Sequence, residues 1–242
     1  MARSVVPAAA SSLLSPMLDG SARRTALVEV ARTRTSVHYD TGRDDVPVLC
    51  VCLPSAVRLP NALVSSSLPT GPATVEQGAF VAGHATWAVR RWWTPPRPRD
   101  LVAPARPSLP SLPSLPGVTV PAEIRPDLLV GAGPGLTPAG DDVLAGVLVA
   151  AHATADPRLA ALRTGARRAL RTRTTTAVSR GLLTHALDGW ATPELADFLI
   201  AMCAGTIGET ADRLLAVGHT SGAALAAGAM HVFTYPPLEG AA

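Results

Sequence analysis

The sequence predicts an α+β protein, with an N-terminal antiparallel β-rich domain followed by a C-terminal all-α domain. Over residues 26–93, short β-branched or alternating runs are separated by Gly, Pro, Asn and Asp, as in the antiparallel strands of a barrel or sandwich. Over residues 122–235, apolar residues recur at helical spacing. Nine prolines crowd the segment 94–121 between them, where we place the domain boundary.

Composition narrows the classes of function. The chain has 242 residues, of which 48% are hydrophobic and 16% charged, so it can bury a core as one large domain or two small ones. All 21 basic residues are arginine, which excludes a Schiff-base lysine and the lysine of a phosphate-binding P-loop. With a net charge of +3 and no basic run interleaved with aromatics, we expect no nucleic-acid partner. We also expect no membrane association, because no apolar stretch approaches about 18 residues.

Residues 1–25 are expected to form an N-terminal arm. Its apolar run, residues 5–18, is interrupted by Pro7 and Pro16 and has no convincing cleavage site, so an amphipathic helix is favoured over a signal peptide. The three cysteines lack metal-binding or disulfide spacing and are interpreted as reduced core thiols. These features predict a cytoplasmic location.

The expected strands follow in order, and a proline-rich segment ends them. They are the runs ALVEVA, SVHYD, VPVLCVCLP, AVRLP, ALVSSSL, GAFVAG and ATWAVRRWW. The segment 94–121 contains the repeat SLPSLPSLP, which favours polyproline II and cannot enter a central sheet. This segment is either a semi-rigid linker or a strap packed on the surface.

A glycine-rich loop, Gly131–Asp142, precedes the first long helix. Thr137 followed by Pro138 is typical of a helix N-cap and first helical residue. Asp141 and Asp142 then fall in the opening turns, and a loop of this kind at a helix N-terminus can hold an anion. The structural alternative is a tight turn whose two carboxylates only stabilise the helix dipole.

Two later segments repeat this pattern of hydroxyls before a helix. Thr175, Thr176 and Ser179 precede a leucine-rich helix, where they either line a site or simply cap the helix. The segment 218–222, GHTSG, leads into a helix of small residues, and its His219 is a candidate acid, base or anion donor, with a surface or core role as the alternative. Small residues let helices approach closely, so we expect both loops to meet at one cleft.

These motifs also carry a family resemblance. GAGPGLTPAGDDVLAG (131–146), TTxxS (175–179) and GHTSG (218–222) resemble the AllH-like family, formerly a domain of unknown function, which includes a subunit of the bacterial oxamate carbamoyltransferase of allantoin catabolism. The resemblance implies a carbamoyltransferase subunit that works with other subunits. It also implies a pocket for a small anionic substrate, namely carbamoyl phosphate or a small carboxylate.

Two alternative functions remain open at this level. One is a non-catalytic structural or regulatory subunit, and the other is a magnesium-dependent phosphotransfer enzyme using both aspartates. No resident cofactor or metal site is predicted, apart from magnesium in the phosphotransfer alternative. A homo-oligomer of this chain is a further possible quaternary structure. The catalytic candidates are Asp141, Asp142 and His219, and the substrate-binding candidates are Gly133, Gly135, Thr137, Gly140, Thr175, Thr176, Ser179, Thr220, Ser221 and Gly222.

Overall fold

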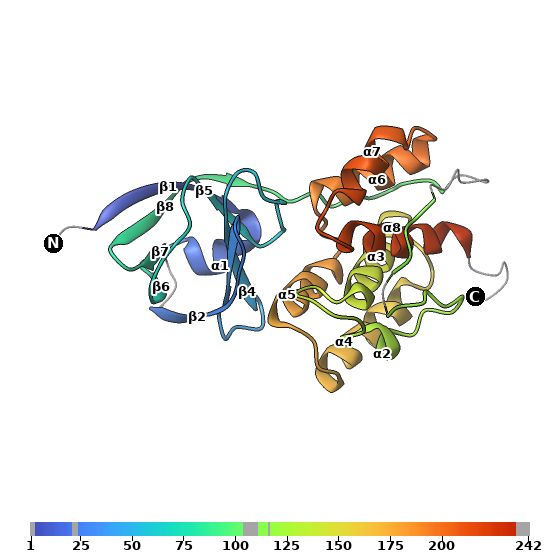
Figure 1. Cartoon of the computed structure of the whole chain (residues 1–242), viewed down its shortest axis with the longest axis horizontal. Coiled ribbons are helices and arrows are strands. Elements are labelled where there is room, and N and C mark those ends of the chain that lie inside the picture. The colour runs from blue at the N-terminus through green and yellow to red at the C-terminus, as the bar shows by residue number, and fades with distance from the viewer. Residues whose placement is uncertain (1–2, 21–23, 104–110, 116, 236–242) are drawn as a thin grey trace. The chain divides into compact units, whose positions relative to one another are not determined.

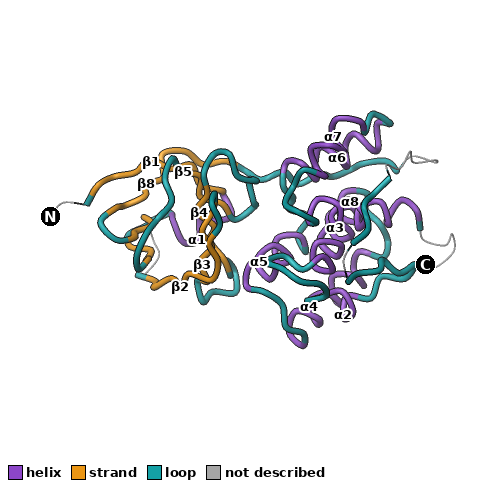
Figure 2. The backbone as a smooth tube through the Cα atoms, in the orientation of Figure 1, coloured by secondary structure: helices purple, strands orange, loops and turns teal. Residues whose placement is uncertain are grey.

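The computed structural model describes residues 3–20, 24–103, 111–115 and 117–235. The chain divides into two compact units, Met1–Pro95 with Arg180–Leu182, and Pro96–Ser179 with Leu183–Ala242. The described strands all lie in the first unit, and the helices from residue 126 onward lie wholly or mostly in the second (Figures 1 and 2). The predicted α+β class is therefore confirmed, with the β-rich part preceding the helices.

The strands form one closed barrel in the order β1-β5-β4-β3-β2-β6-β7-β8. They are β1 (Ser4–Ser11), β2 (Thr25–Arg32), β3 (Ser36–Asp40), β4 (Val48–Cys52), β5 (Ala62–Ser65), β6 (Ala73–Glu76), β7 (Ala79–Ala82) and β8 (Ala85–Trp93). The β1–β8 and β4–β5 pairs are parallel, and the other neighbours are antiparallel. The expectation of an antiparallel barrel or sandwich is corrected to a closed barrel of mixed strand direction.

The helix expected over residues 5–18 is wrong for most of its length. Ser4–Ser11 is strand β1, which pairs with β8 on one side and β5 on the other. Only a 3₁₀ turn, η1 (Ser12–Leu14), and a short helix, α1 (Ser15–Leu18), follow it. Pro7 is unsuited to a helix interior, and it stands just before the residues that pair with β5. Residues 1–2 and 21–23 of the expected arm lie outside the described residues.

The barrel core explains why the arm joins the sheet. Phe80 contacts both Tyr39 and Trp87, with ring centroids 5.3 Å apart in each pair, the first pair tilted and the second edge-to-face. Leu14 and Met17, which follow β1, are fully buried in the same core. The arm thus contributes apolar area that an isolated surface helix would leave in water.

One run expected to be a strand is a loop. Residues 56–60, AVRLP, connect β4 to β5, and their backbone bonds are local, for example from Leu59 N–H to Val57 O at 3.1 Å. β4 and β5 run parallel, so the chain must return to the starting end of the sheet between them. That return occupies the run.

The described parts of the proline-rich segment pack as a strap on the helical core. Leu112, Leu115 and Val118 are partly buried against that core. The backbone N–H of Leu101 donates to Ala153 O at 2.9 Å, which fixes the beginning of the segment. Residues 104–110 and 116, which include part of the SLPSLPSLP repeat, lie outside the described residues.

The helical unit is built around α3, nearly all of which is buried. The helices are α2 (Pro126–Leu129), α3 (Ala139–Ala153), α4 (Leu159–Thr172), α5 (Ala177–Ala186), α6 (Pro193–Ala204), α7 (Gly208–Leu215) and α8 (Ser221–Thr234). α3 and α8 lie side by side (Figure 1). A Cβ on Gly146 would overlap Leu225 O, and one on Gly228 would overlap Val143 O. The predicted close approach of the small-residue helices is confirmed. Among the described helices, none combines the length and apolarity needed to cross a membrane.

Candidate functional site

The glycine-rich loop meets the first turns of α3, α5 and α8 at one place. We call the five side chains gathered there, Thr137, Asp141, Asp142, Thr175 and Ser221, the Asp142 cluster. The Thr137 and Ser221 hydroxyl oxygens are 2.8 Å apart, although the residues are far apart in sequence. The predicted convergence of the two loops is therefore confirmed, whereas substrate binding there stays a prediction.

Thr137 does not cap α3, contrary to expectation. The helix begins at Ala139, its N-cap is Pro138, and no side chain caps it. The Thr137 hydroxyl bonds instead to Ser221 on α8. A tertiary partner has replaced the local cap, which places this hydroxyl inside the cluster.

Asp141 holds the loop in place. Only 2% of it is exposed, and both carboxylate oxygens have donors: Gly131 N–H to Oδ1 at 2.9 Å, and the Thr175 hydroxyl to Oδ2. Gly131 has φ +78°, and a Cβ there would overlap Thr174 O, so this close approach requires glycine. Asp141 thereby ties the glycine loop to the segment before α5.

Thr176 makes a second connection between the same two segments. Its hydroxyl donates to Leu136 O at 2.7 Å, and its oxygen accepts from Ser179 N–H at 3.0 Å. It is therefore the N-cap of α5, as the structural alternative supposed, and a tether for the loop as well.

Asp142 is in a different state from its neighbour. It is 5% exposed, and its buried Oδ2 has no hydrogen-bond partner. Burial, with a further contribution from the charge of Asp141, raises the pKa of Asp142 to about 7, although the hydroxyls of Ser221 and Thr137 act to lower it. A buried acceptor without a donor is costly, so Asp142 Oδ2 is an unsatisfied polar atom within the Asp142 cluster.

The free backbone donors belong to the loop rather than to the helix start. The N–H of Gly140 donates to Ala132 O at 2.8 Å, and those of both aspartates donate to Pro138 O. Within the described contacts, no acceptor is found for the N–H groups of Gly133, Gly135 and Leu136. Gly135 and Leu136 are also exposed, so this part of the loop is accessible to a ligand.

The remaining candidate residues have weaker links to the cluster. Ser179 is 1% exposed and its hydroxyl oxygen has no partner. Gly222 packs against Leu214 O and donates its N–H to Val217 O, so packing accounts for it. Thr220 precedes α8 without capping it through its side chain. His219 is exposed, and no contact described for it joins it to the cluster.

The donor pattern bears on a metal. Both Asp141 oxygens are already bound by donors, which leaves Asp142 as the one carboxylate of the pair with an available oxygen. Within the described residues, no group of three or more His, Cys, Asp or Glu side chains is placed to hold a metal ion. A magnesium site that uses the two aspartates together with a substrate phosphate stays a prediction.

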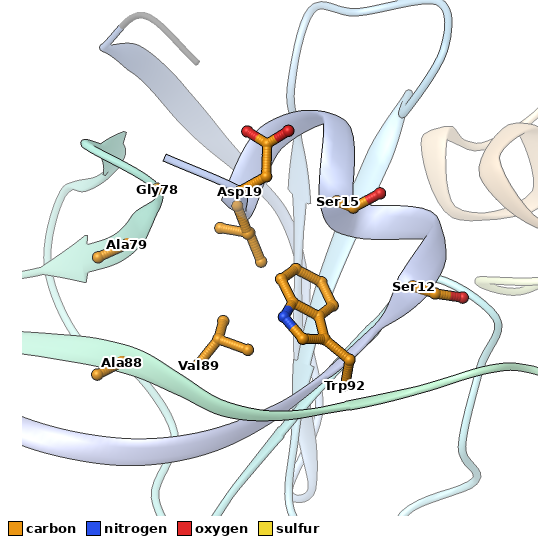
Figure 3. A pocket seen from close by; sticks show the side chains of 9 residues that line it. Ser12, Ser15, Asp19, Gly78, Ala79, Ala88, Val89 and Trp92 are labelled. Carbon is orange, nitrogen blue, oxygen red and sulfur yellow. The ribbon is translucent and has the colours of Figure 1, made fainter. Parts of the chain in front are cut away.

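Two hollows lie away from the cluster. One, of 580 Å³, is in the barrel, where Trp92 of β8 lies near Val89 and faces the segment carrying Ser15 and Asp19 (Figure 3). The other, of 310 Å³, is in the helical unit and includes His231 and Arg158. His231 Nε2 lies 3.0 Å from Ala122 O, and Arg158 pairs with Asp156, so these two side chains have partners. Asp142 lines neither of these two hollows.

The fold and the cluster together define the class: an α+β protein whose helical unit carries a buried acidic site. Residues 129–233 match the sequence profile of the family described as Oxamate carbamoyltransferase subunit AllH. The resemblance read from the motifs is thereby confirmed over these residues, which contain the whole Asp142 cluster. No solved structure matches the chain.

Proposed function

We propose that this chain is a subunit of a carbamoyltransferase of the oxamate type, and that the Asp142 cluster with the glycine loop forms its substrate pocket. The observation that carries the proposal is the buried, unpaired Oδ2 of Asp142, within the segment that matches the AllH family. Other buried polar atoms of the chain also lack a partner, but this one adjoins the glycine loop, whose amides at Gly133, Gly135 and Leu136 have no described acceptor.

The loop suits the anionic part of such a substrate. Amides of Gly133, Gly135 and Leu136 without described acceptors would hold a phosphate or carboxylate without any lysine. Carbamoyl transfer depends chiefly on holding two reactants in position and on stabilising charge at the carbonyl and the departing phosphate. Preorganised amides and hydroxyls provide both.

The site is incomplete in one respect, which favours work in an assembly. The contacts described for the cluster include no arginine side chain, and the positive groups described there are the partial charges of the loop amides. We expect a partner subunit to supply the missing cation. The chain would then contribute to catalysis at a subunit boundary.

Reconstitution tests this proposal. The chain is co-expressed and purified with the products of its neighbouring genes, and the complex is given oxamate and carbamoyl phosphate while the carbamoylated product and released phosphate are measured. We expect activity that requires this chain, and a loss of about tenfold or more in Ser221→Ala, because a hydroxyl beside the reacting groups is removed. Thr164→Val is the matched control, since it removes a hydroxyl bonded only to its own helix.

The same experiment distinguishes the proposed catalytic role from the alternative of a non-catalytic subunit. If the complex requires the chain but Ser221→Ala and Thr164→Val are equally active, the cluster is structural and the chemistry lies in other subunits. If the chain never associates and no activity depends on it, the proposed function is wrong altogether.

A further inference from the structure

The Asp142 cluster and the adjoining loop present opposite hydrogen-bonding groups. The loop offers donors, the N–H groups of Gly133, Gly135 and Leu136. The buried end offers an acceptor, Asp142 Oδ2, which no protein donor reaches. A ligand that satisfies both must carry an anion or acceptor at one end and a hydrogen-bond donor at the other.

We infer that Asp142 recognises the amide end of the substrate, with its Oδ2 accepting an N–H from a primary carboxamide whose neighbouring group is an anion. This inference rests on the proposed function of the cluster and deepens it. It makes Asp142 the residue that determines which end of the substrate enters the buried part of the site.

An anion could not occupy that buried position favourably. Asp141 is ionisable, is 2% exposed and is adjacent to Asp142 in the first turn of α3. Above about pH 7, where Asp142 is ionised, placing a phosphate or carboxylate oxygen against it would bring like charges together where water screens them little. An amide N–H removes this conflict and at the same time satisfies the orphaned oxygen.

The hydroxyl pair supports the same orientation. Thr137 and Ser221 are bonded to each other at 2.8 Å and lie close enough to Asp142 to affect its pKa. Each hydroxyl can rotate to donate or accept, so the pair can serve the carbonyl oxygen of a carboxamide beside its N–H₂ group. A donor and an acceptor side by side match the two polar atoms of a primary amide.

Two small molecules share the required chemistry. Oxamate carries a primary amide next to a carboxylate, and carbamoyl phosphate carries one next to a phosphate. Each has an analogue of similar size in which the amino group is replaced: oxalate, where it becomes a carboxylate oxygen, and acetyl phosphate, where it becomes a methyl group. The two pairs distinguish which substrate places its amide at Asp142.

The test measures binding of all four compounds by calorimetry, to the full chain and to the co-purified complex. The proteins are the unmodified chain, Asp142→Asn, and Asp197→Asn as a matched control, because Asp197 is an exposed residue of α6 paired with Arg213. We expect at least one amide compound to bind about tenfold or more tightly than its analogue. Asp142→Asn should shrink that ratio to near one because asparagine can also donate, while Asp197→Asn should retain it.

The outcomes separate this inference from the proposed function. Equal binding of amide and analogue by the unmodified protein, in both pairs, overturns the role of Asp142 and leaves the pocket in place. A preference that survives Asp142→Asn overturns it as well, because another group must then recognise the amide. Failure of all four compounds to bind either the chain or an active complex overturns the proposed pocket itself, and the inference with it.

Discussion

Replacing Asp142 by asparagine should stabilise the protein in a pH-dependent way. The folded-state pKa of Asp142 is about 7, raised from 3.8 mainly by burial. The folded chain therefore retains a proton that the unfolded chain releases between about pH 4 and pH 7, so the free energy of unfolding falls as pH rises through this window. Asparagine has the same shape and no charge, so it removes this penalty.

The size of the effect follows from the two pKa values. Raising a pKa from 3.8 to about 7 corresponds to about 4 kcal/mol, at 1.36 kcal/mol for each tenfold change. The full difference between Asp142→Asn and the unmodified chain should appear above about pH 7. It should shrink to near zero at about pH 3 and below, where the carboxyl is protonated in both the folded and unfolded states.

Denaturant unfolding followed by far-ultraviolet circular dichroism measures this difference, because the signal comes largely from the helical unit. Asp197→Asn serves as the control and should show no comparable gain at about pH 8. The reasoning is refuted if Asp142→Asn is less stable than the unmodified chain at about pH 8, or if its gain is the same at about pH 5. Either result would mean that Asp142 is well solvated or paired in the folded protein.

Three other substitutions test the packing and hydrogen bonding of the helical unit. Gly146→Ala should lower the free energy of unfolding by about 1–3 kcal/mol, because its methyl group would overlap Leu225 O, and a raised melting temperature would contradict this. Gly208→Ala, at a helical glycine with nothing within 4 Å, should instead be neutral or stabilise by up to about 1 kcal/mol in the same melting experiment. Thr175→Val should cost about 1–3 kcal/mol in chemical unfolding, because it removes a donor from the buried carboxylate of Asp141, and no loss would show that water replaces the hydroxyl.

The sequence was enough to predict that the two loops meet, because the residues of each loop and of the helix after it favour the same arrangement. Glycines, hydroxyls and small helical residues stand in the same order in the two segments, and close packing of α3 on α8 brings their starts together. The end of α3 at Ala153 and the start of α6 after Thr192 also follow from periodicity and capping residues. These features depend on residues near one another in the sequence.

What the sequence did not reveal depends on distant partners. The strand at Ser4–Ser11 exists because β8, some eighty residues away, pairs along its whole length, and no local pattern indicates that pairing. Thr137 and Pro138 have the sequence pattern of a helix start, yet the Thr137 hydroxyl bonds to Ser221 and does not cap α3. Tertiary contacts outweighed local preference in both places.

The two adjacent aspartates show the same limit at the site. Both could be placed at the start of a helix from the sequence, but not distinguished. Asp141 meets Gly131 and Thr175, whereas Asp142 faces a position where its Oδ2 has no donor. The packing of several elements around them makes the difference: Asp141 holds the loop in place, whereas Asp142 retains an oxygen without a donor. The exposure of His219 likewise follows from how its turn is placed.

A crystal structure of the full chain or its complex with oxamate bound is the most direct test of the central claim, that the Asp142 cluster is the substrate site. The account predicts the amide nitrogen of oxamate within hydrogen-bond distance, about 3 Å, of Asp142 Oδ2, with its carboxylate at the loop amides of Gly133 to Leu136. Oxamate bound elsewhere in an active complex, or bound here with its carboxylate against Asp142, would contradict it.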